Sequence, residues 1–323
     1  MAPKSTIPGF VLLDKEAGET SFKALFPLKR VFCTKRVGHA GTLDLRASGL
    51  IIAATGRATR LLPYVEAKEK CYSFRLHLGY ETDTLEWDGD VLEQDERFDK
   101  LSDLSKCPEP AEGLEGLFDA SSVAKVLSQF VGDIEQIPPK YCAVKINGVR
   151  ASDLMERGRN VELKPRKIHI ESLELLGEAD GTDPTCTGKC MAAFDLVCVC
   201  SKGTYIRALG RDIGRALGTF GCVSRIRRLR IGHVTLDRAV KGADLTAADL
   251  VPVDQVLEFP VVRMGDAELA SIRNGNWIPW KVPVENVGPE CRVFAANRDG
   301  EVLSLCKYEP GRILADVYLA EDG

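Results

Sequence analysis

A glycine-rich stretch that runs into an apolar segment is the strongest constraint on how this chain can fold. Residues 38–49, GHAGTLDLRASG, place three glycines around a single carboxylate, Asp44. Glycine lets a backbone turn sharply and lie close to a bulky ligand. The apolar run that follows, residues 50–54, is typical of a buried strand that would hold the loop on a rigid element. From composition alone an ordinary aspartate in a turn is the commoner case, so the importance of Asp44 depends on the rest of the chain.

Length and composition indicate a globular protein with a large core. The chain has 323 residues, of which 45% are hydrophobic, which suits two domains or one large domain with an appendage. No segment approaches the roughly 18 apolar residues that a membrane helix requires, and the N-terminus lacks the apolar core of a signal peptide. The eleven cysteines are odd in number and irregularly spaced, which disfavours a disulfide framework. We therefore expect a cytoplasmic protein.

The cysteine spacing also argues against a structural zinc site. Cys186 and Cys190 are four apart and Cys198 and Cys200 are two apart, whereas structural sites usually leave two residues between paired ligands. Alternation along residues 194–200 places Cys198 and Cys200 on the apolar face of a strand. We interpret them as buried thiols that act as small hydrophobic side chains.

The charges are segregated along the chain although the net charge is only −4. Residues 81–135 contain 16 acidic and 4 basic residues, while residues 140–167 contain 8 basic and 3 acidic. Residues 202–230 contain 8 basic residues and 1 acidic residue. A solvated basic face is one interpretation. Two basic segments of this strength are also what binding to a phosphate backbone requires.

Hydrophobic periodicity predicts the first elements: a strand at 10–15, helices at 20–31 and 56–66, and a half-buried strand at 70–79. In this last strand Tyr72 shares the apolar face, where its ring could meet the core or a ligand. His77 falls on the opposite face, and we expect it to be exposed.

A helix with unusual charge placement is predicted after residue 205. Thr204 is the expected N-cap, and Ile206, Leu209 and Ile213 form an apolar stripe. Arg207 then lies in the first turn, where the helix dipole disfavours a cation unless an anion is near. Arg207 is therefore a candidate partner for a carboxylate or a phosphate. Residues 225–231 predict a strand whose apolar residues face one way.

Three further segments have distinct characters. Residues 95–118 form an acidic insertion that we place at the surface. Residues 138–167 form a basic arm with an Asn147-Gly148 turn, either a plain surface hairpin and helix or an arm that grips a phosphate backbone. Residues 251–323, rich in proline and in short strand patterns, predict a small β-rich domain.

Several of these segments together resemble the motifs of one enzyme family. The segments are, in chain order, GFVLLDK (9–15) with Gly18, Thr20 and Ser21; GHAGTLD (38–44) with Ala47 and Gly49; KCY (70–72); GYETDT (79–84) with Asp88 and Gly89; IPP (137–139) with Tyr141, Ala143 and Lys145; SKGTYIR (201–207); and RRL (227–229). In this order they resemble the bacterial TruB family of tRNA pseudouridine synthases. One such motif is weak evidence, but seven in order are specific.

The resemblance implies a fold of the α+β class. We expect a mixed, mostly antiparallel central sheet flanked by helices in a catalytic domain of residues 1–250. Residues 251–323 would form a small PUA-like domain, and the basic arm 138–167 would be the thumb-like element that holds RNA.

The resemblance also implies which residues carry the chemistry. Asp44 would be the catalytic aspartate. Arg207 would pair with it and keep it ionised, because a neighbouring cation favours the charged form of a carboxylate.

The remaining site residues would bind the substrate base. Tyr72 would stack on it, Tyr205 and Leu229 would wall its pocket, and His39 would hold the base and flanking nucleotides. A lone loop histidine with a purely structural role is the alternative for His39.

The implied reaction isomerises uridine 55 in the T loop of tRNA to pseudouridine without a cofactor. The aspartate would attack the anomeric carbon of the sugar or the uracil ring, after the target nucleotide has flipped out. No protein partner is implied, and we expect a monomer. A tRNA-binding folding factor with little catalysis and a sibling synthase for another RNA are the alternatives. Two departures concern the loop, since Glu16 and Leu45 stand where the family usually has proline, and a lost proline frees φ.

Overall fold

The computed structural model describes residues 8–96, 118–179, 190–288 and 291–320. The chain divides into two compact units. Unit 1 comprises Met1–Lys68 with Arg230–Gly323, and unit 2 comprises Glu69–Leu229. The predicted acidic insertion lies almost entirely outside the described residues. No helix in the described part of the chain is long and apolar enough to span a membrane.

The first part of unit 1 is built on β1 and β3, which are antiparallel neighbours with Leu12 opposite Ile52. Both strands are almost continuously buried, as expected of apolar runs that are covered on both faces. β2 pairs with β3 in the antiparallel sense, and β14 pairs with β1 in the parallel sense. The elements are β1 (Gly9–Lys15), η1 (Lys23–Leu25), α1 (Phe26–Val31), β2 (Val37–Ala40), β3 (Ser48–Thr55), η2 (Gly56–Leu61), α2 (Leu62–Ala67), β13 (Val234–Thr235), η5 (Leu236–Arg238), β14 (Val240–Lys241), η6 (Ala247–Asp249) and η7 (Val253–Gln255).

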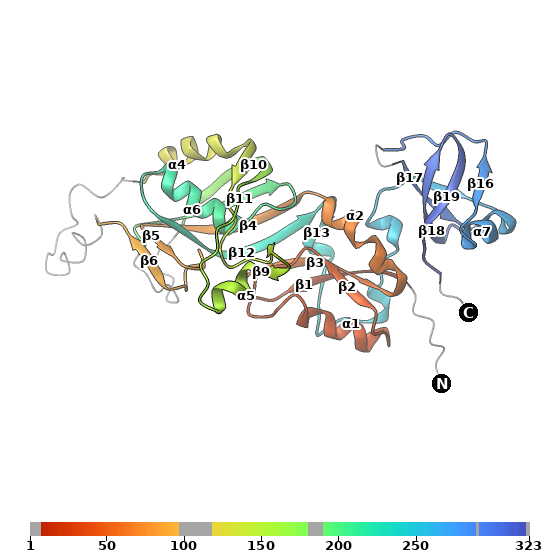
Figure 1. Ribbon diagram of the computed structural model, residues 1–323, viewed down its shortest axis with the longest axis horizontal. Coiled ribbons are helices and arrows are strands. Elements are labelled where there is room, and N and C mark those ends of the chain that lie inside the picture. Colours follow the sequence, from red (N-terminus) through yellow and green to blue (C-terminus); the bar gives the residue numbers. More distant parts are fainter. Residues whose placement is uncertain (1–7, 97–117, 180–189, 289–290, 321–323) are drawn as a thin grey trace. The chain divides into compact units, whose positions relative to one another are not determined.

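Residues 251–320 contribute a second, five-stranded sheet to unit 1 (Figure 1). Its order is β15-β17-β18-β19-β16, and all its neighbours are antiparallel except β15 and β17. The elements are β15 (Val261–Arg263), α7 (Asp266–Arg273), β16 (Trp277–Trp280), β17 (Arg292–Ala296), β18 (Val302–Glu309) and β19 (Gly311–Tyr318).

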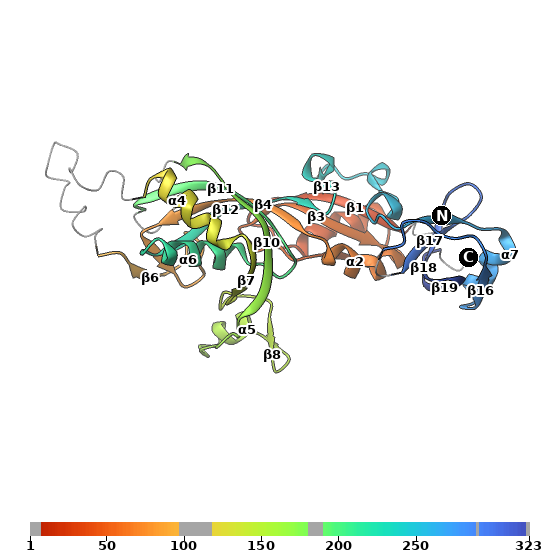
Figure 2. The same ribbon diagram turned by 90° about the horizontal axis from the view of Figure 1, so that it is seen from above.

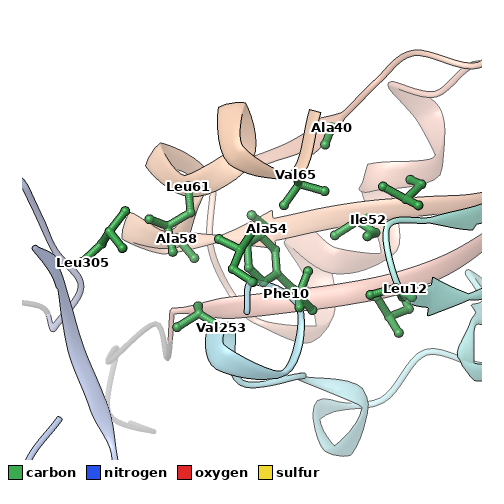
Figure 3. Packing of buried hydrophobic residues seen from close by; sticks show 14 of the residues in the cluster. Phe10, Leu12, Ala40, Ile52, Ala54, Ala58, Leu61, Val65, Val253 and Leu305 are labelled. Atoms are coloured by element: carbon green, nitrogen blue, oxygen red, sulfur yellow. The ribbon is translucent and has the colours of Figure 1, made fainter. Parts of the chain in front are cut away.

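One hydrophobic cluster joins the two parts of unit 1. Figure 3 shows Phe10 and Ala54 from the first sheet close to Ala58 and Leu61, with Leu305 of β18 beside them. At the rim of this cluster the Tyr64 hydroxyl donates to Asp316 Oδ2 at 3.1 Å. Unit 1 therefore has a continuous core that runs from residues near the N-terminus into the C-terminal sheet.

Unit 2 is an antiparallel sheet with helices packed on it. Its strands lie in the order β12, β4, β11, β10, β7, and β5 and β6 form a separate hairpin. The elements are β4 (Lys70–Leu78), β5 (Tyr80–Thr82), β6 (Val91–Gln94), α4 (Ala120–Leu127), η4 (Ser128–Phe130), β7 (Gly132–Gln136), β8 (Lys145–Ile146), β9 (Val149–Arg150), α5 (Ala151–Glu156), β10 (Arg166–Ala179), β11 (Ala192–Cys200), α6 (Ile206–Ala216) and β12 (Gly221–Ile231), whose last two residues belong to unit 1. The predicted α+β class, with mostly antiparallel pairing and a β-rich C-terminal part, is confirmed.

The basic arm is a small folded structure of its own. β8 and β9 form a hairpin closed by Asn147 and Gly148, which both have positive φ, as this type of two-residue turn requires. The hairpin and α5 enclose a cluster around the buried residues Cys142, Ala151 and Val161. Figure 2 shows α5 and β8 projecting from unit 2 beyond β7 and β10.

Two predictions about buried and exposed faces are wrong. His77 is fully buried, and its Nε2 lies 2.7 Å from the Ser224 hydroxyl, because both faces of β4 are covered at this end. Ile226 and Arg228 share the buried face of β12, and Leu229 lies on the other face, three residues from Ile226. The apolar residues of β12 therefore do not share one side. Burial of Cys198 and Cys200, by contrast, is confirmed.

Glycines allow α6 to pack directly against β12. A Cβ added at Gly214 would lie 2.5 Å from the backbone nitrogen of Gly221, and one at Gly210 would clash with the Val223 side chain. The backbone of Gly221 cannot rotate away as a flexible side chain can. The separation between α6 and β12 is therefore set by residues without side chains.

We predict that Gly214→Ala destabilises the protein although alanine favours a helix. Overpacking against backbone costs about 1–3 kcal/mol, which exceeds the gain of up to ~1 kcal/mol in helix propensity. The free energy of unfolding from urea denaturation measures the effect. Gly177→Ala is the matched control, because Gly177 has no atom within 4 Å of the added Cβ. Equal stability of the two variants would contradict the packing argument.

Candidate active site

The loop that carries Asp44 is held in place by a buried lysine. Lys15 is 1% exposed, and its Nζ donates to the carbonyl oxygens of Ala47 at 2.6 Å, Glu16 at 2.9 Å and Leu45 at 3.4 Å. A buried ammonium is tolerated only when its donors are satisfied, and carbonyl oxygens provide this here. Lys15 therefore links the end of β1 to Leu45 and Ala47, which follow Asp44 in the loop.

Ser21 and Gly18 hold the same loop from the other side. The Ser21 hydroxyl donates to the Leu43 carbonyl at 3.0 Å and accepts from the Leu43 N–H at 2.9 Å. The Gly18 N–H donates to the Leu45 carbonyl at 2.8 Å. Leu45, which is 49% exposed, lacks the ring that fixes φ in proline, but backbone hydrogen bonds hold it. The first two motifs thus meet at one loop.

Asp44 and His39 lie near each other in the chain but in different settings. Asp44 is half-buried in the loop between β2 and β3, and its carbonyl accepts from the Ala47 N–H at 3.2 Å. His39 is half-buried in β2, opposite Ala53 of β3. Both belong to unit 1, whereas Tyr72, Tyr205, Arg207 and Leu229 belong to unit 2.

In unit 2, Arg207 draws three motifs together. It is 4% exposed, and its guanidinium donates to the Thr84 carbonyl and to the Tyr141 carbonyl, each at 2.8 Å. Its place in the first turn of α6 is as predicted. The two acceptors come from different motifs, so Arg207 fixes both of them relative to α6.

The backbone of Tyr205 is fixed by the side chain of Gln136. Tyr205 N–H donates to Gln136 Oε1 at 2.9 Å, and Gln136 Nε2 donates to the Tyr205 carbonyl at 3.2 Å. The prediction that Thr204 caps the helix is wrong, because Tyr205 occupies the N-cap position without a side-chain cap. The Tyr205 side chain packs against the apolar cluster of the arm.

The base of the arm has a second anchor and a shielded tyrosine. Arg211 donates to the Ile137 carbonyl at 2.8 Å. The pKa of Tyr141 is raised by burial and by the carboxylate of Asp83, so this hydroxyl stays protonated. Further along α6, Arg215 lies 3.0 Å from Glu81, whose pKa is raised by burial against the opposing effect of Arg215. Helix α6 therefore holds the arm through its arginines.

Tyr72 and Leu229 lie on neighbouring strands of the unit 2 sheet. Tyr72 is half-buried near the start of β4, opposite Cys198 of β11, and Leu229 is half-buried in β12, which adjoins β4. Half-buried positions leave part of each side chain accessible to a ligand.

Sequence reasoning did not assign a role in the site to Lys15, Ser21 or Gln136. Lys15 and Ser21 were part of a recognised motif, and a lysine that ends an apolar strand was the available signal. Gln136 gave no signal, because its partner is 69 residues away in the sequence.

Comparisons with known proteins identify the family. Residues 29–206 match the N-terminal domain of TruB family pseudouridylate synthases. Three relatives are each named tRNA pseudouridine synthase B. That of Borreliella afzelii is 31% identical over 299 residues, covering 93% of this chain and 94% of that protein. That of Mycobacterium tuberculosis H37Rv is 35% identical over 312 residues, covering 95% and 94%. That of Bradyrhizobium diazoefficiens is 37% identical over 283 residues, covering 83% and 74%.

Solved structures agree on the fold. A chain of an H/ACA ribonucleoprotein bound to a substrate RNA containing 2'-deoxyuridine matches with a TM-score of 0.64 at 19% identity, covering 99% of this chain and 86% of that one. A chain of the archaeal box H/ACA Nop10–Cbf5 complex matches with a TM-score of 0.62 at 21% identity, covering 98% and 86%. The chain belongs to the TruB family of pseudouridylate synthases, and the resemblance read from its motifs is confirmed.

We predict that Lys15→Met lowers the free energy of unfolding by about 1–3 kcal/mol, because it removes the ammonium that donates to the buried carbonyl of Ala47. Urea denaturation measures this change. Lys241→Met is the matched control, since Lys241 is an exposed lysine paired with Glu16 at 2.9 Å, and its loss should change stability less. If Lys15→Met were as stable as the control, the lysine would not hold the loop.

Proposed function

We propose that this protein converts uridine 55 in the T loop of tRNA into pseudouridine, with Asp44 as the catalytic carboxylate. The observation that supports this most is the loop itself. A loop held by a buried lysine and a buried serine displays one half-buried carboxylate in a chain of the TruB family. Such rigid support is what a catalytic group needs.

The reaction is a balanced rearrangement. The bond between C1' of the ribose and N1 of uracil breaks, and a bond between C1' and C5 forms. C5 loses its proton and N1 gains one, so substrate and product are isomers and no oxidant, reductant or cofactor enters. Asp44 serves as the nucleophile toward the anomeric carbon or the uracil ring.

Arg207 is proposed as the partner that keeps Asp44 ionised. Support comes from its burial and from the two carbonyl acceptors that fix its guanidinium in one position. A neighbouring guanidinium favours the charged form of a carboxylate, and only the charged form is a nucleophile.

The other site residues are proposed to receive the flipped uracil. Tyr72 stacks on the base, Tyr205 and Leu229 wall the pocket, and His39 holds the base and its neighbours. Stacking in an apolar pocket offsets the cost of unpairing a nucleotide, which is a few kcal/mol.

The basic arm is proposed as the element that grips the tRNA. Its eight basic residues are all exposed, at positions 140, 145, 150, 157, 159, 164, 166 and 167. The small core of the arm holds these cations on an ordered scaffold, and Arg207 and Arg211 tie its base to α6. Residues 251–323 are proposed to bind RNA as a PUA-like domain. The protein is proposed to act as a monomer in the cytoplasm, where tRNA is available.

We predict that unmodified tRNA incubated with the wild-type protein gains pseudouridine at position 55, and that Asp44→Asn lowers the rate at least about a thousandfold. Asparagine keeps the size of the side chain and removes its nucleophilic charge. Mapping pseudouridine in the tRNA measures the product, and binding of the same tRNA to both proteins is the control. Absence of product with both proteins would leave the folding factor, and product at another position would indicate a sibling synthase.

We also predict that Lys145→Ala with Arg150→Ala weakens tRNA binding and reduces the slope of log affinity against log salt by about two. Each lost phosphate contact lowers the slope by about one. Titrations at several salt concentrations measure the slope. Lys125→Ala, which removes an exposed cation from α4, is the control. An unchanged slope in the double variant would exclude phosphate contacts by the hairpin.

A further inference from the structure

Two exposed phenylalanines stand side by side on α1 and the turn before it. Phe22 is 60% exposed and Phe26 is 50% exposed. Their ring centroids are 5.5 Å apart with an interplanar angle of 81°. Single exposed apolar residues are ordinary on a protein surface, but an adjacent pair of exposed aromatic rings indicates a surface that binds another molecule.

A cation completes this patch. The Nζ of Lys29 lies 4.9 Å from the centre of the Phe22 ring and 5.0 Å from that of Phe26. Both distances fall within the range of a cation–π interaction. The patch therefore combines aromatic faces with an ammonium group, the two groups that proteins use to bind unpaired nucleotides.

The patch is directly linked to the Asp44 loop. Phe22 follows Ser21, whose hydroxyl exchanges two hydrogen bonds with the backbone of Leu43, next to Asp44. All of these residues belong to unit 1. The aromatic pair is thus tied to the loop on which the proposed chemistry takes place.

The surrounding charge favours a polyanion over a protein partner. Between Glu19 and Asp44 the chain has five basic residues and no acidic one. Lys23, Arg30, Lys35 and Arg36 are exposed. Lys23 and Arg30 lie within four residues of the pair in the chain, and these cations disfavour an apolar protein surface as the partner, because each would lose hydration on binding.

We propose that Phe22, Phe26 and Lys29 form a platform for an unpaired nucleotide of the substrate RNA near the target uridine. The base stacks on a phenylalanine ring, and Lys29 meets the phosphate. The proposal rests on the proposed function, since it takes the RNA substrate as the ligand. It adds a contact outside the pocket formed by Tyr72, Tyr205 and Leu229.

The test measures affinity in an Asp44→Asn background, so that the substrate is not converted, with a T-arm stem-loop RNA as the probe. Phe22→Ala with Phe26→Ala should weaken binding about tenfold or more. Phe22→Leu with Phe26→Leu is the matched control for hydrophobicity and should weaken binding similarly, because leucine has no aromatic face. Phe22→Tyr with Phe26→Tyr should stay within about threefold of the parent, since tyrosine keeps the ring. Lys29→Met should lower the salt slope by about one.

Two outcomes would overturn the platform. One is an alanine double variant that binds within about twofold of the parent, and the other is a leucine double variant that binds as tightly as the parent. Thermal unfolding of each variant establishes that it is folded, and the single change Phe22→Ala repeats the test if the double variant is not. The Asp44→Asn background forms no product, so the binding result does not depend on whether the wild-type protein catalyses the reaction. Failure of the wild-type protein to form pseudouridine would overturn the function and not the platform.

Discussion

The buried ammonium of Lys15 is the interaction on which the candidate site depends. Residues 41–47 lie between two strands and lack the regular hydrogen bonds of a sheet, yet buried carbonyls must find donors. Lys15 of β1 lies opposite Gly49 of β3, so its side chain reaches the turn that comes directly before β3. Three of its hydrogen bonds end on carbonyls of this region. A flexible, glycine-rich segment thereby takes one conformation and carries Asp44 in a defined place.

In unit 2, buried polar side chains also hold backbone segments in place through hydrogen bonds. Arg207 and Arg211 donate to the Thr84, Tyr141 and Ile137 carbonyls, and Gln136 holds the backbone of Tyr205. These groups connect α6 to the base of the arm. Arg207 and Arg211 are buried and hold backbone carbonyls, whereas the eight basic residues of the arm are exposed. Counts of charge along the sequence cannot separate the two.

Much of the architecture could be predicted because it rests on local pattern. The apolar runs of β1 and β3, the alternation of β4 and the Asn147-Gly148 turn each predict their element from neighbouring residues. The errors arise where burial depends on a distant partner. His77 is buried because both faces of β4 are covered at this end, and its ring contacts the hydroxyl of Ser224, which is 147 residues away in the sequence. Arg228 shares the buried face of β12 with Ile226, although an arginine is usually found at the surface. Thr204 is not the cap because Tyr205 occupies the N-cap position, and the distant Gln136 holds the backbone of Tyr205.

The sequence by itself determined the family, the α+β class and the candidate residues, since motif order and hydrophobic periodicity are written along the chain. It also located the basic arm, because charge is a property of composition. Only the tertiary structure decided which polar side chains hold the loop and the arm, and that Phe22, Phe26 and Lys29 meet at the surface beside that loop. The physical reason is that hydrogen bonds and ring contacts act over a few ångströms. Their partners are chosen by how the strands and helices pack, and a pattern of neighbouring residues does not contain that information.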